Sequence, residues 1–171
     1  MTNKTITPRW YQVEAVAAVW DFIRQNDGNP CVELPTGAGK SIVIARLMLD
    51  TLAWGGRVVL LAHRKELLEQ TAEKIEALEP SIDVGVFSAG LKRRDTKHDV
   101  LAAGIQSVRD RADQLGRRDV IIVDEAHLIP TDGDGMFRRF IADSRVINPN
   151  VRIVGLTATP YRLRTGLVCG N

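Results

Sequence analysis

The chain has 171 residues, of which 44% are hydrophobic and 26% are charged, so it can bury the core of one domain and is too short for two large ones. Its 23 Lys and Arg residues and 21 Asp and Glu residues give a formal net charge of +2, an excess too small to identify a partner. No apolar run approaches the ~20 residues needed to cross a bilayer, and the N-terminal stretch MTNKTITPRW lacks the apolar core of a signal peptide, so we expect a cytoplasmic protein with no membrane partner.

Short β-branched runs alternate along the chain with longer segments of helical periodicity. In chain order, the pattern predicts a helix over 11–23, a strand over 31–34, a helix over 42–52, a strand over 57–62, a helix over 64–78, strands over 82–87 and 99–103, a short helix over 105–115, a strand over 119–125, a short helix over 136–143 and a strand over 151–157. Several strands are apolar on both faces, as expected for a parallel sheet with helices on each side. We therefore expect an α/β domain of three layers with a mainly parallel central sheet, in which ligands bind beyond the carboxyl ends of the strands.

The stretch ELPTGAGKS joins the first predicted strand to the second predicted helix, and its composition is that of a phosphate-binding loop. Gly37 and Gly39 allow the backbone to aim successive N–H groups inward as an anion nest, and the following helix adds its positive dipole end. Lys40 can reach the β- and γ-phosphates of a nucleotide, and the Ser41 hydroxyl can hold Mg²⁺. The strict pattern begins with Gly where this chain has Leu, so a Gly-rich turn that happens to carry Lys and Ser is the alternative. The residues predicted to bind nucleotide in this loop are Thr36, Gly37, Ala38, Gly39, Lys40 and Ser41.

The stretch DVIIVDEAH, residues 119–127, is an apolar strand that ends in two adjacent carboxylates. Asp124 would bind Mg²⁺ through water, because Mg²⁺ retains much of its hydration shell. Glu125 would orient and deprotonate the attacking water. Alone, the two carboxylates could simply begin a polar loop, with His127 capping a nearby group. Together with the upstream loop, they predict a nucleoside-triphosphate site in which Ser41 and Asp124 converge on one Mg²⁺.

Three motifs in this order, LPTGAGKS, DEAH at 124–127 and LTATP at 156–160, resemble those of the superfamily-two DEAD/DEAH-box helicases, in their N-terminal RecA-like motor domain. The resemblance spans about residues 6 to 166, and that family tolerates a residue other than Gly at the start of its P-loop. It implies a three-layer RecA-like P-loop NTPase fold, ATP and Mg²⁺ as cofactors, and ATP hydrolysis that drives a DNA helicase or translocase. By this likeness the catalytic residues are Lys40, Asp124, Glu125 and His127.

Two further segments resemble nucleotide-sensing motifs of the same family. In PRWYQVEAV, residues 8–16, Gln12 would hydrogen-bond the adenine edge and Arg9 would pack against the base, which would favour ATP. The alternative is that Gln12 is a surface residue on a helix anchored by its aromatic neighbours. Thr157 and Thr159 would form the coupling motif, because their hydroxyls can bond to the DEAH loop and report the nucleotide state. A capping or turn role is the alternative for these threonines.

Other segments resemble the family's nucleic-acid contacts. LLAHRKELLEQ, residues 60–70, resembles motif Ia, in which Arg64 would touch the phosphates of one strand. GIQSV resembles motif Ib, with Gln106 and Ser107 as further contacts, although it departs from the common pattern at Gly104, where Thr is usual. The alternative for Arg64 is a solvated cation at a helix start.

Within the superfamily, the stretches FSAGLKRR, IQSV and TATPYRLRTG resemble RadD-type bacterial DNA-repair helicases. This likeness makes Lys92, Arg93 and Arg94 candidate DNA contacts, although a short basic run is also typical of a solvated face. The expected partners are therefore nucleic acid, with DNA favoured over RNA, and repair proteins.

A helicase of this kind needs two RecA-like domains with ATP between them, and the second domain supplies an arginine finger. We expect residues 1–171 to form a single RecA-like ATP-binding domain, the N-terminal part of a longer protein, with little activity by itself. Two other functions stay open. One is a non-enzymatic nucleotide- and nucleic-acid-binding module that signals to a partner, and the other is the motor subunit of a restriction system.

Overall fold

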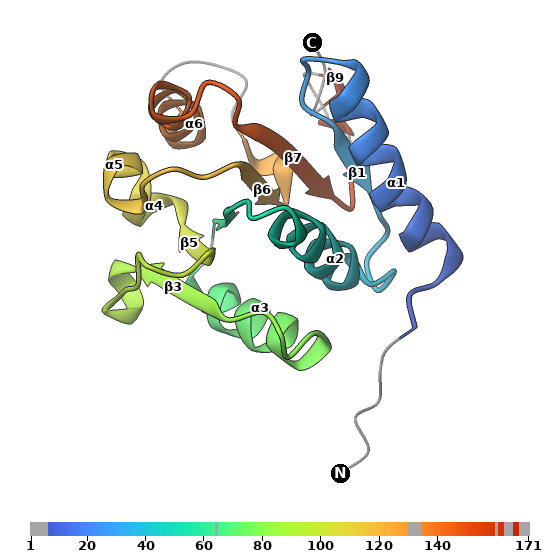
Figure 1. Cartoon of the computed structure of the whole chain (residues 1–171), viewed down its shortest axis with the longest axis horizontal. Coiled ribbons are helices and arrows are strands. Elements are labelled where there is room, and N and C mark those ends of the chain that lie inside the picture. Colours follow the sequence, from blue (N-terminus) through green and yellow to red (C-terminus); the bar gives the residue numbers. More distant parts are fainter. Residues whose placement is uncertain (1–6, 64, 130–134, 160, 163–165, 168–171) are drawn as a thin grey trace.

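A computed structural model describes residues 7–63, 65–129, 135–159, 161–162 and 166–167. Within them, a seven-stranded sheet has the order β1-β7-β6-β2-β5-β3-β4 (Figure 1). Its strands are β1 (Cys31–Glu33), β2 (Val58–Ala62), β3 (Val84–Ser88), β4 (Arg93–Arg94), β5 (Val100–Gly104), β6 (Val120–Asp124) and β7 (Arg152–Thr157). All neighbouring strands are parallel except β3 and β4, which are antiparallel. A separate antiparallel pair consists of β8 (Tyr161–Arg162) and β9 (Gly166–Leu167).

Helices connect these strands and cover both faces of the sheet (Figure 1). The α-helices are α1 (Trp10–Gln25), α2 (Lys40–Ala53), α3 (Lys65–Leu78), α4 (Ile105–Val108), α5 (Ala112–Leu115) and α6 (Met136–Ile147), and the two short 3₁₀ turns are η1 (Ala89–Leu91) and η2 (Ala126–Leu128). None of the helices in the described part of the chain combines the length and the apolarity that crossing a bilayer would require.

The side-chain alternation along β2 shows how the layers are built. Val58, Leu60 and Ala62 belong to a buried cluster with residues of α1, α2 and α3, whereas Val59 and Leu61 belong to a second buried cluster with residues of α4, α5 and α6. Because successive strand residues point to opposite faces, a strand buried on both faces must be apolar throughout. The predicted three-layer α/β domain with a mainly parallel sheet is confirmed.

The structure differs from the sequence prediction in several places, including strands β8 and β9, which were not predicted, and α6, which extends beyond residue 143 to Ile147. The segment predicted as one short helix over 105–115 forms two single-turn helices, because the backbone of Arg111 leaves helical values at φ −139° and ψ 30°. The apolar spacing that suggested the helix is real, since both turns bury their apolar residues in the same cluster. Strand β4 was not predicted, because its two residues are exposed arginines with no apolar alternation.

The carboxyl ends of three strands meet at one edge of the sheet. Glu33 at the end of β1 pairs with Thr157 of β7, and Asp124 at the end of β6 pairs with Leu156 of β7. Because the three strands are parallel neighbours, the loops that follow them emerge side by side. The three motifs singled out in the sequence therefore share this edge.

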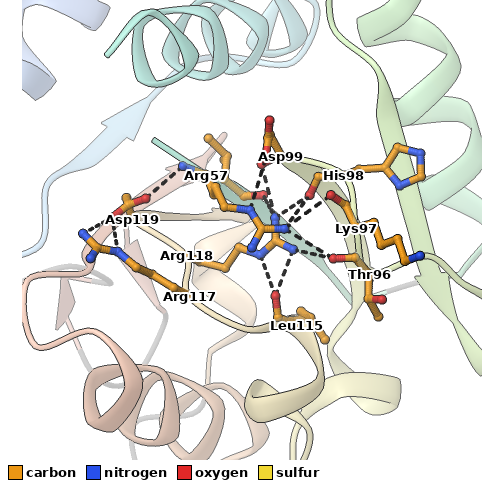
Figure 2. Close-up of polar contacts among 10 residues, drawn as sticks. Arg57, Thr96, Lys97, His98, Asp99, Leu115, Arg117, Arg118 and Asp119 are labelled. Carbon is orange, nitrogen blue, oxygen red and sulfur yellow. Dashed lines mark hydrogen bonds and ion pairs between the residues drawn. The ribbon is translucent and has the colours of Figure 1, made fainter. Parts of the chain in front are cut away.

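At the opposite edge, a buried arginine ties together the segments that lead into β2, β5 and β6. The Arg118 guanidinium donates hydrogen bonds of 2.8–3.2 Å to the carbonyl oxygens of Thr96, His98, Asp99 and Leu115. Figure 2 shows the Arg57 side chain beside it, and Arg57 also donates to carbonyls of the 96–98 segment. Burial and the neighbouring Arg57 charge lower the pKa of Arg118 to about 10, so it stays charged at neutral pH.

Replacing Arg118 by Met should lower the free energy of unfolding by about 2–4 kcal/mol, because the buried guanidinium and its hydrogen bonds to four carbonyl groups would be lost. Urea denaturation of the chain measures this change. Arg117→Met is the matched control, since the Arg117 side chain is 67% exposed and pairs with Asp119 at the surface. Its effect should be within about 0.5 kcal/mol. Equal effects of the two substitutions would show that the carbonyl contacts do not stabilise this edge.

Candidate active site

The residues after β1 form a tight loop that leads directly into α2. Gly37 and Gly39 have φ values of 82° and 85°, in the left-handed region that favours glycine. A Cβ on Gly39 would lie 2.4 Å from Nε2 of Gln12, so a larger residue there would displace the Gln12 side chain. Lys40 and Ser41 are the first residues of the 14-residue helix α2, at the positive end of its dipole. This geometry suits a phosphate group.

The start of α1 is tied to this loop through one carbonyl oxygen. Gln12 Nε2 donates to the oxygen of Ala38 at 2.8 Å, and the Tyr11 hydroxyl donates to the same oxygen at 3.0 Å. Gln12 Oε1 accepts the backbone N–H of Arg9 at 2.8 Å, and the exposed Arg9 side chain donates to the Tyr11 hydroxyl at 3.3 Å. Arg9 and Gln12 therefore adjoin the phosphate loop, and their contact with a base stays a prediction. Tyr11 was not predicted as a site residue, and only its place beside Gln12 could have indicated it.

A groove of about 440 Å³ lies beside Gln12, between α1 and α2. Its lining is mostly apolar and includes Pro8, Val13 and Ile42, and Arg46 is the one cation among the described residues that line it. A concave apolar surface with a few polar groups suits a base and a sugar. A larger hollow of about 680 Å³ between α1 and α6 has no charged side chain among the described residues that line it, and this lining does not suit a triphosphate.

Lys40 joins the phosphate loop to the DEAH loop. Its Nζ forms an ion pair with Glu125 Oε1 and lies 4.0 Å from Asp124 Oδ1. Glu125 has a φ of 53°, a left-handed conformation that costs a non-glycine residue about 1 kcal/mol. The loop that carries both carboxylates is thus held in a strained conformation by its surroundings. Ser41 is half-buried next to Lys40, and its convergence with Asp124 on one metal ion stays a prediction.

The environment of Asp124 disfavours its charge. Burial is the largest cause that raises the pKa of Asp124 above its ordinary value of 3.8, and the Glu125 charge acts in the same direction. Lys40 and the backbone N–H of Glu125 lower the pKa but do not offset the burial. A carboxylate held in this way would gain stability from a nearby cation, which fits the predicted metal ligand.

His127 connects the DEAH loop to the end of β7. Its Nδ1 lies 2.9 Å from Thr157 Oγ1 and 3.2 Å from Glu125 Oε2. The Thr157 hydroxyl donates to the carbonyl of Thr159 at 3.0 Å and accepts the Thr159 N–H at 3.1 Å, so towards His127 it acts as an acceptor. The structure therefore brings Thr157 to the DEAH loop, whereas Thr159 takes part through its backbone. The coupling role of both threonines stays a prediction.

The structure describes some, but not all, of the residues predicted to contact nucleic acid. Arg64 lies outside the described residues. Gln106 is exposed on α4, and the half-buried Ser107 accepts at its hydroxyl, at 2.9 Å, the backbone N–H that follows β3. The departure at Gly104 has a packing explanation, because a Cβ there would lie 3.3 Å from Leu68 of α3. The glycine lets α3 approach the sheet closely.

The predicted basic contacts lie on the β3–β4 connection and β4. Lys92, with a φ of 53°, forms the turn, and Arg93 and Arg94 form β4, with all three exposed. Arg93 donates to Asp95 at 2.7 Å, so part of its charge is already paired. The hydrogen bond to Ser107 places Ala89, three residues before Lys92, beside α4. The two predicted nucleic-acid segments are thus connected through the residues that follow β3.

A protein-family profile matches most of the chain. A family profile described as the type III restriction enzyme res subunit matches residues 5–162. The chain belongs to this family. Its fold and motifs also place it among the N-terminal RecA-like domains of superfamily-two helicases. The stretch matched by the res-subunit profile contains every predicted site residue from Arg9 to Thr159.

The curated relatives of this res-subunit domain are longer proteins. The chain is 28% identical over 169 residues to the ATP-dependent DNA helicase Hel308 of Methanocella arvoryzae, covering 89% of this chain and 22% of that protein. It is 30% identical over 132 residues to a 51.5 kDa protein of a Lactococcus phage, covering 77% of this chain and 24% of that protein. The chain thus spans about a quarter of the length of these relatives.

Solved structures share the fold. The UvsW helicase from bacteriophage T4 is 20% identical, with a TM-score of 0.71, over 91% of this chain and 54% of that one. The Hef helicase domain of Pyrococcus furiosus is 24% identical, with a TM-score of 0.72, over 92% of this chain and 34% of that one. At these identities the likeness shows a common fold.

Replacing Asp124 by Asn should stabilise the chain without divalent cations, and the gain should depend on pH. Because the pKa of Asp124 is raised in the folded state, this residue does not destabilise the fold below about pH 3.8, the ordinary pKa. The free energy of unfolding then falls as the pH rises through the pKa of folded Asp124. Asparagine carries no charge at any of these pH values. The difference in free energy of unfolding between variant and wild type should therefore grow with pH, as measured by urea denaturation from pH 4 to about 8. Asp143→Asn, at an exposed position of α6, should show no such trend. A pH-independent difference at Asp124 would contradict the assigned burial.

Proposed function

We propose that the chain is the ATP-binding motor domain of an ATP-dependent DNA helicase or translocase. The observation that carries the proposal is that Lys40 of the phosphate loop is paired with Glu125 and adjoins Asp124 of the DEAH loop. Membership of the res-subunit family and the named helicase among the relatives support the same function. Phosphoryl transfer needs little covalent chemistry from a protein, so positioned charges of this kind are its main requirement.

The residues present fit ATP and Mg²⁺. The left-handed glycines leave a backbone cradle in which Thr36 to Gly39 would bind phosphate, and Ser41 and Asp124 would hold the metal. When bound, Mg²⁺ would neutralise phosphate charge during transfer. Phosphate oxygens and water would complete the coordination of the metal, because Mg²⁺ retains several waters and is commonly held by one or two carboxylates together with substrate phosphates.

The described contacts give each residue a role during turnover. Lys40 forms an ion pair with Glu125, so it must exchange this carboxylate for phosphate oxygens when ATP binds. Glu125 is then free to accept a proton from the attacking water. His127, which lies between Glu125 and Thr157, orients the carboxylate and carries the state of the site to β7. Arg9, Gln12 and the α1–α2 groove would receive the adenosine.

The wider proposed function includes a second RecA-like domain. A second RecA-like domain in the same full-length protein would provide the arginine finger, so residues 1–171 alone should bind ATP weakly and hydrolyse it slowly. The likeness to RadD-type repair helicases supports DNA repair as the setting and repair proteins as partners. The res-subunit family description favours a second candidate, the motor subunit of a restriction system. Either function would be carried out in the cytoplasm.

Lys40→Ala should weaken ATP·Mg²⁺ binding to the chain by at least about 100-fold, because the variant loses its phosphate-binding cation. Glu125→Gln should bind at least as tightly as wild type, because Lys40 loses its competing charged partner, and should stop hydrolysis in the complete protein. Isothermal titration measures both affinities. Lys74→Ala, at an exposed position of α3, is the matched control and should bind like wild type. Unchanged affinity of Lys40→Ala would remove the phosphate loop from the site.

The complete protein should hydrolyse ATP faster when nucleic acid is present. Turnover with single-stranded DNA, duplex DNA and RNA, compared at fixed salt, tests the proposed function. Single-stranded DNA should stimulate most, whereas a preference for duplex would favour the restriction motor. Combined Lys92→Ala and Arg94→Ala substitutions should raise the DNA concentration needed and lower the salt slope by about 0.7 for each lost phosphate contact. Arg24→Ala on the exposed face of α1 is the control. If none of these nucleic acids stimulates ATP turnover, the proposed motor function is wrong.

A further inference from the structure

His63 lies at the junction between the two sides of the proposed motor. It directly follows β2 and directly precedes Arg64, the candidate nucleic-acid contact. The register pairs Leu61 of β2 with Val123 of β6, so the residues after Leu61 run alongside the DEAH loop. Side chains alternate along this stretch, and Leu61 belongs to the cluster with α6. His63, two residues later, therefore returns to the α6 side of the sheet.

The ring of His63 stacks on a buried aromatic residue of α6. The His63 and Phe137 ring centroids are 6.3 Å apart, and the ring planes differ by 14°. Phe137 is 1% exposed and belongs to the same buried cluster as Ala126, the residue after Glu125. Close-packed side chains transmit small displacements because no space is left to absorb them. The ring contact thus connects the segment after β2 to the core beneath the DEAH loop.

A hydrophobic contact alone does not explain a histidine at this position. Nδ1 of His63 is enclosed and has no hydrogen-bond partner among the described residues. Enclosing an unpaired polar atom costs free energy, whereas phenylalanine would stack on Phe137 without that cost. A hydrogen-bond partner gained when the neighbouring segment binds nucleic acid would recover the cost, so the ring would favour the bound arrangement.

We propose that His63 is a positioning residue that links nucleic-acid binding at the segment after β2 to ATP hydrolysis at the DEAH loop, through its ring stacked on Phe137. The proposal rests on the proposed function. His63 touches neither the phosphate loop nor the DEAH carboxylates in the described contacts, so it acts through α6 and the cluster that contains Ala126. The ring stacking and the enclosed nitrogen of His63 can be removed separately, by substituting Phe137 and His63 respectively.

The test compares ATP turnover by the complete protein with and without saturating oligo(dT). His63→Phe keeps the stacking and removes the nitrogen, so turnover without DNA and the KM for ATP should equal those of wild type. Stimulation by DNA should fall about tenfold, a typical size for coupling between two sites. Phe137→Leu keeps the nitrogen and removes the aromatic face, so it should show the same selective loss. The double variant should be no worse than either single variant, because both act on one link.

Phe140→Leu is the matched control, because Phe140 is fully buried on the same helix and in the same cluster but has no contact with the His63 ring among the described ring contacts. It should retain wild-type stimulation. His63→Phe with wild-type stimulation, or Phe140→Leu with an equal loss, would overturn the link. If His63→Phe does not fold, Phe137→Leu against Phe140→Leu decides the question. A wild-type protein that no nucleic acid stimulates would instead overturn the proposed function and this inference with it.

Discussion

The ion pair between Lys40 and Glu125 is the contact on which the site depends. The two residues are 85 positions apart in the sequence, and they meet only because β1, β7 and β6 are parallel neighbours whose carboxyl ends share one edge. An antiparallel arrangement of either outer strand would send one of the two loops to the far edge of the sheet. The order of strands, more than any local motif, therefore creates the place where phosphate and catalytic carboxylate can meet.

The two edges of the sheet differ in physical character. At the amino edge, Arg118 satisfies several carbonyl groups and locks three connections together. At the carboxyl edge, Asp124 carries a raised pKa, Glu125 has a left-handed backbone, and the enclosed Nδ1 of His63 has no hydrogen-bond partner among the described residues. Functional sites commonly retain such unfavourable features because ligands relieve them, while the rest of the fold supplies the stability. The raised pKa of Asp124 and the left-handed backbone of Glu125 fit that division, although the amino edge also encloses nitrogens without a hydrogen-bond partner among the described residues, Nε of Arg57 and Nδ1 of His98.

Much of the fold was predictable because buried parallel strands and amphipathic helices leave strong periodic signals. The apolar run of β2 and the loop around Gly37 and Gly39 are examples, and in both the side-chain type is dictated by local geometry. Features set by tertiary contacts were not predictable. The two arginines of β4 form a strand through pairing alone, Tyr11 reaches the phosphate loop only after α1 docks, and the Gly104 position is set by its distance from Leu68. Such contacts depend on residues far away in the sequence.

The most direct test of the central claim is a crystal structure of the complete protein with Mg²⁺ and a non-hydrolysable ATP analogue. The account predicts that Lys40 will have left Glu125 for the terminal phosphates, with the metal between Ser41 and Asp124 and the base beside Gln12. A triphosphate bound elsewhere, with the Lys40–Glu125 pair intact, would contradict it.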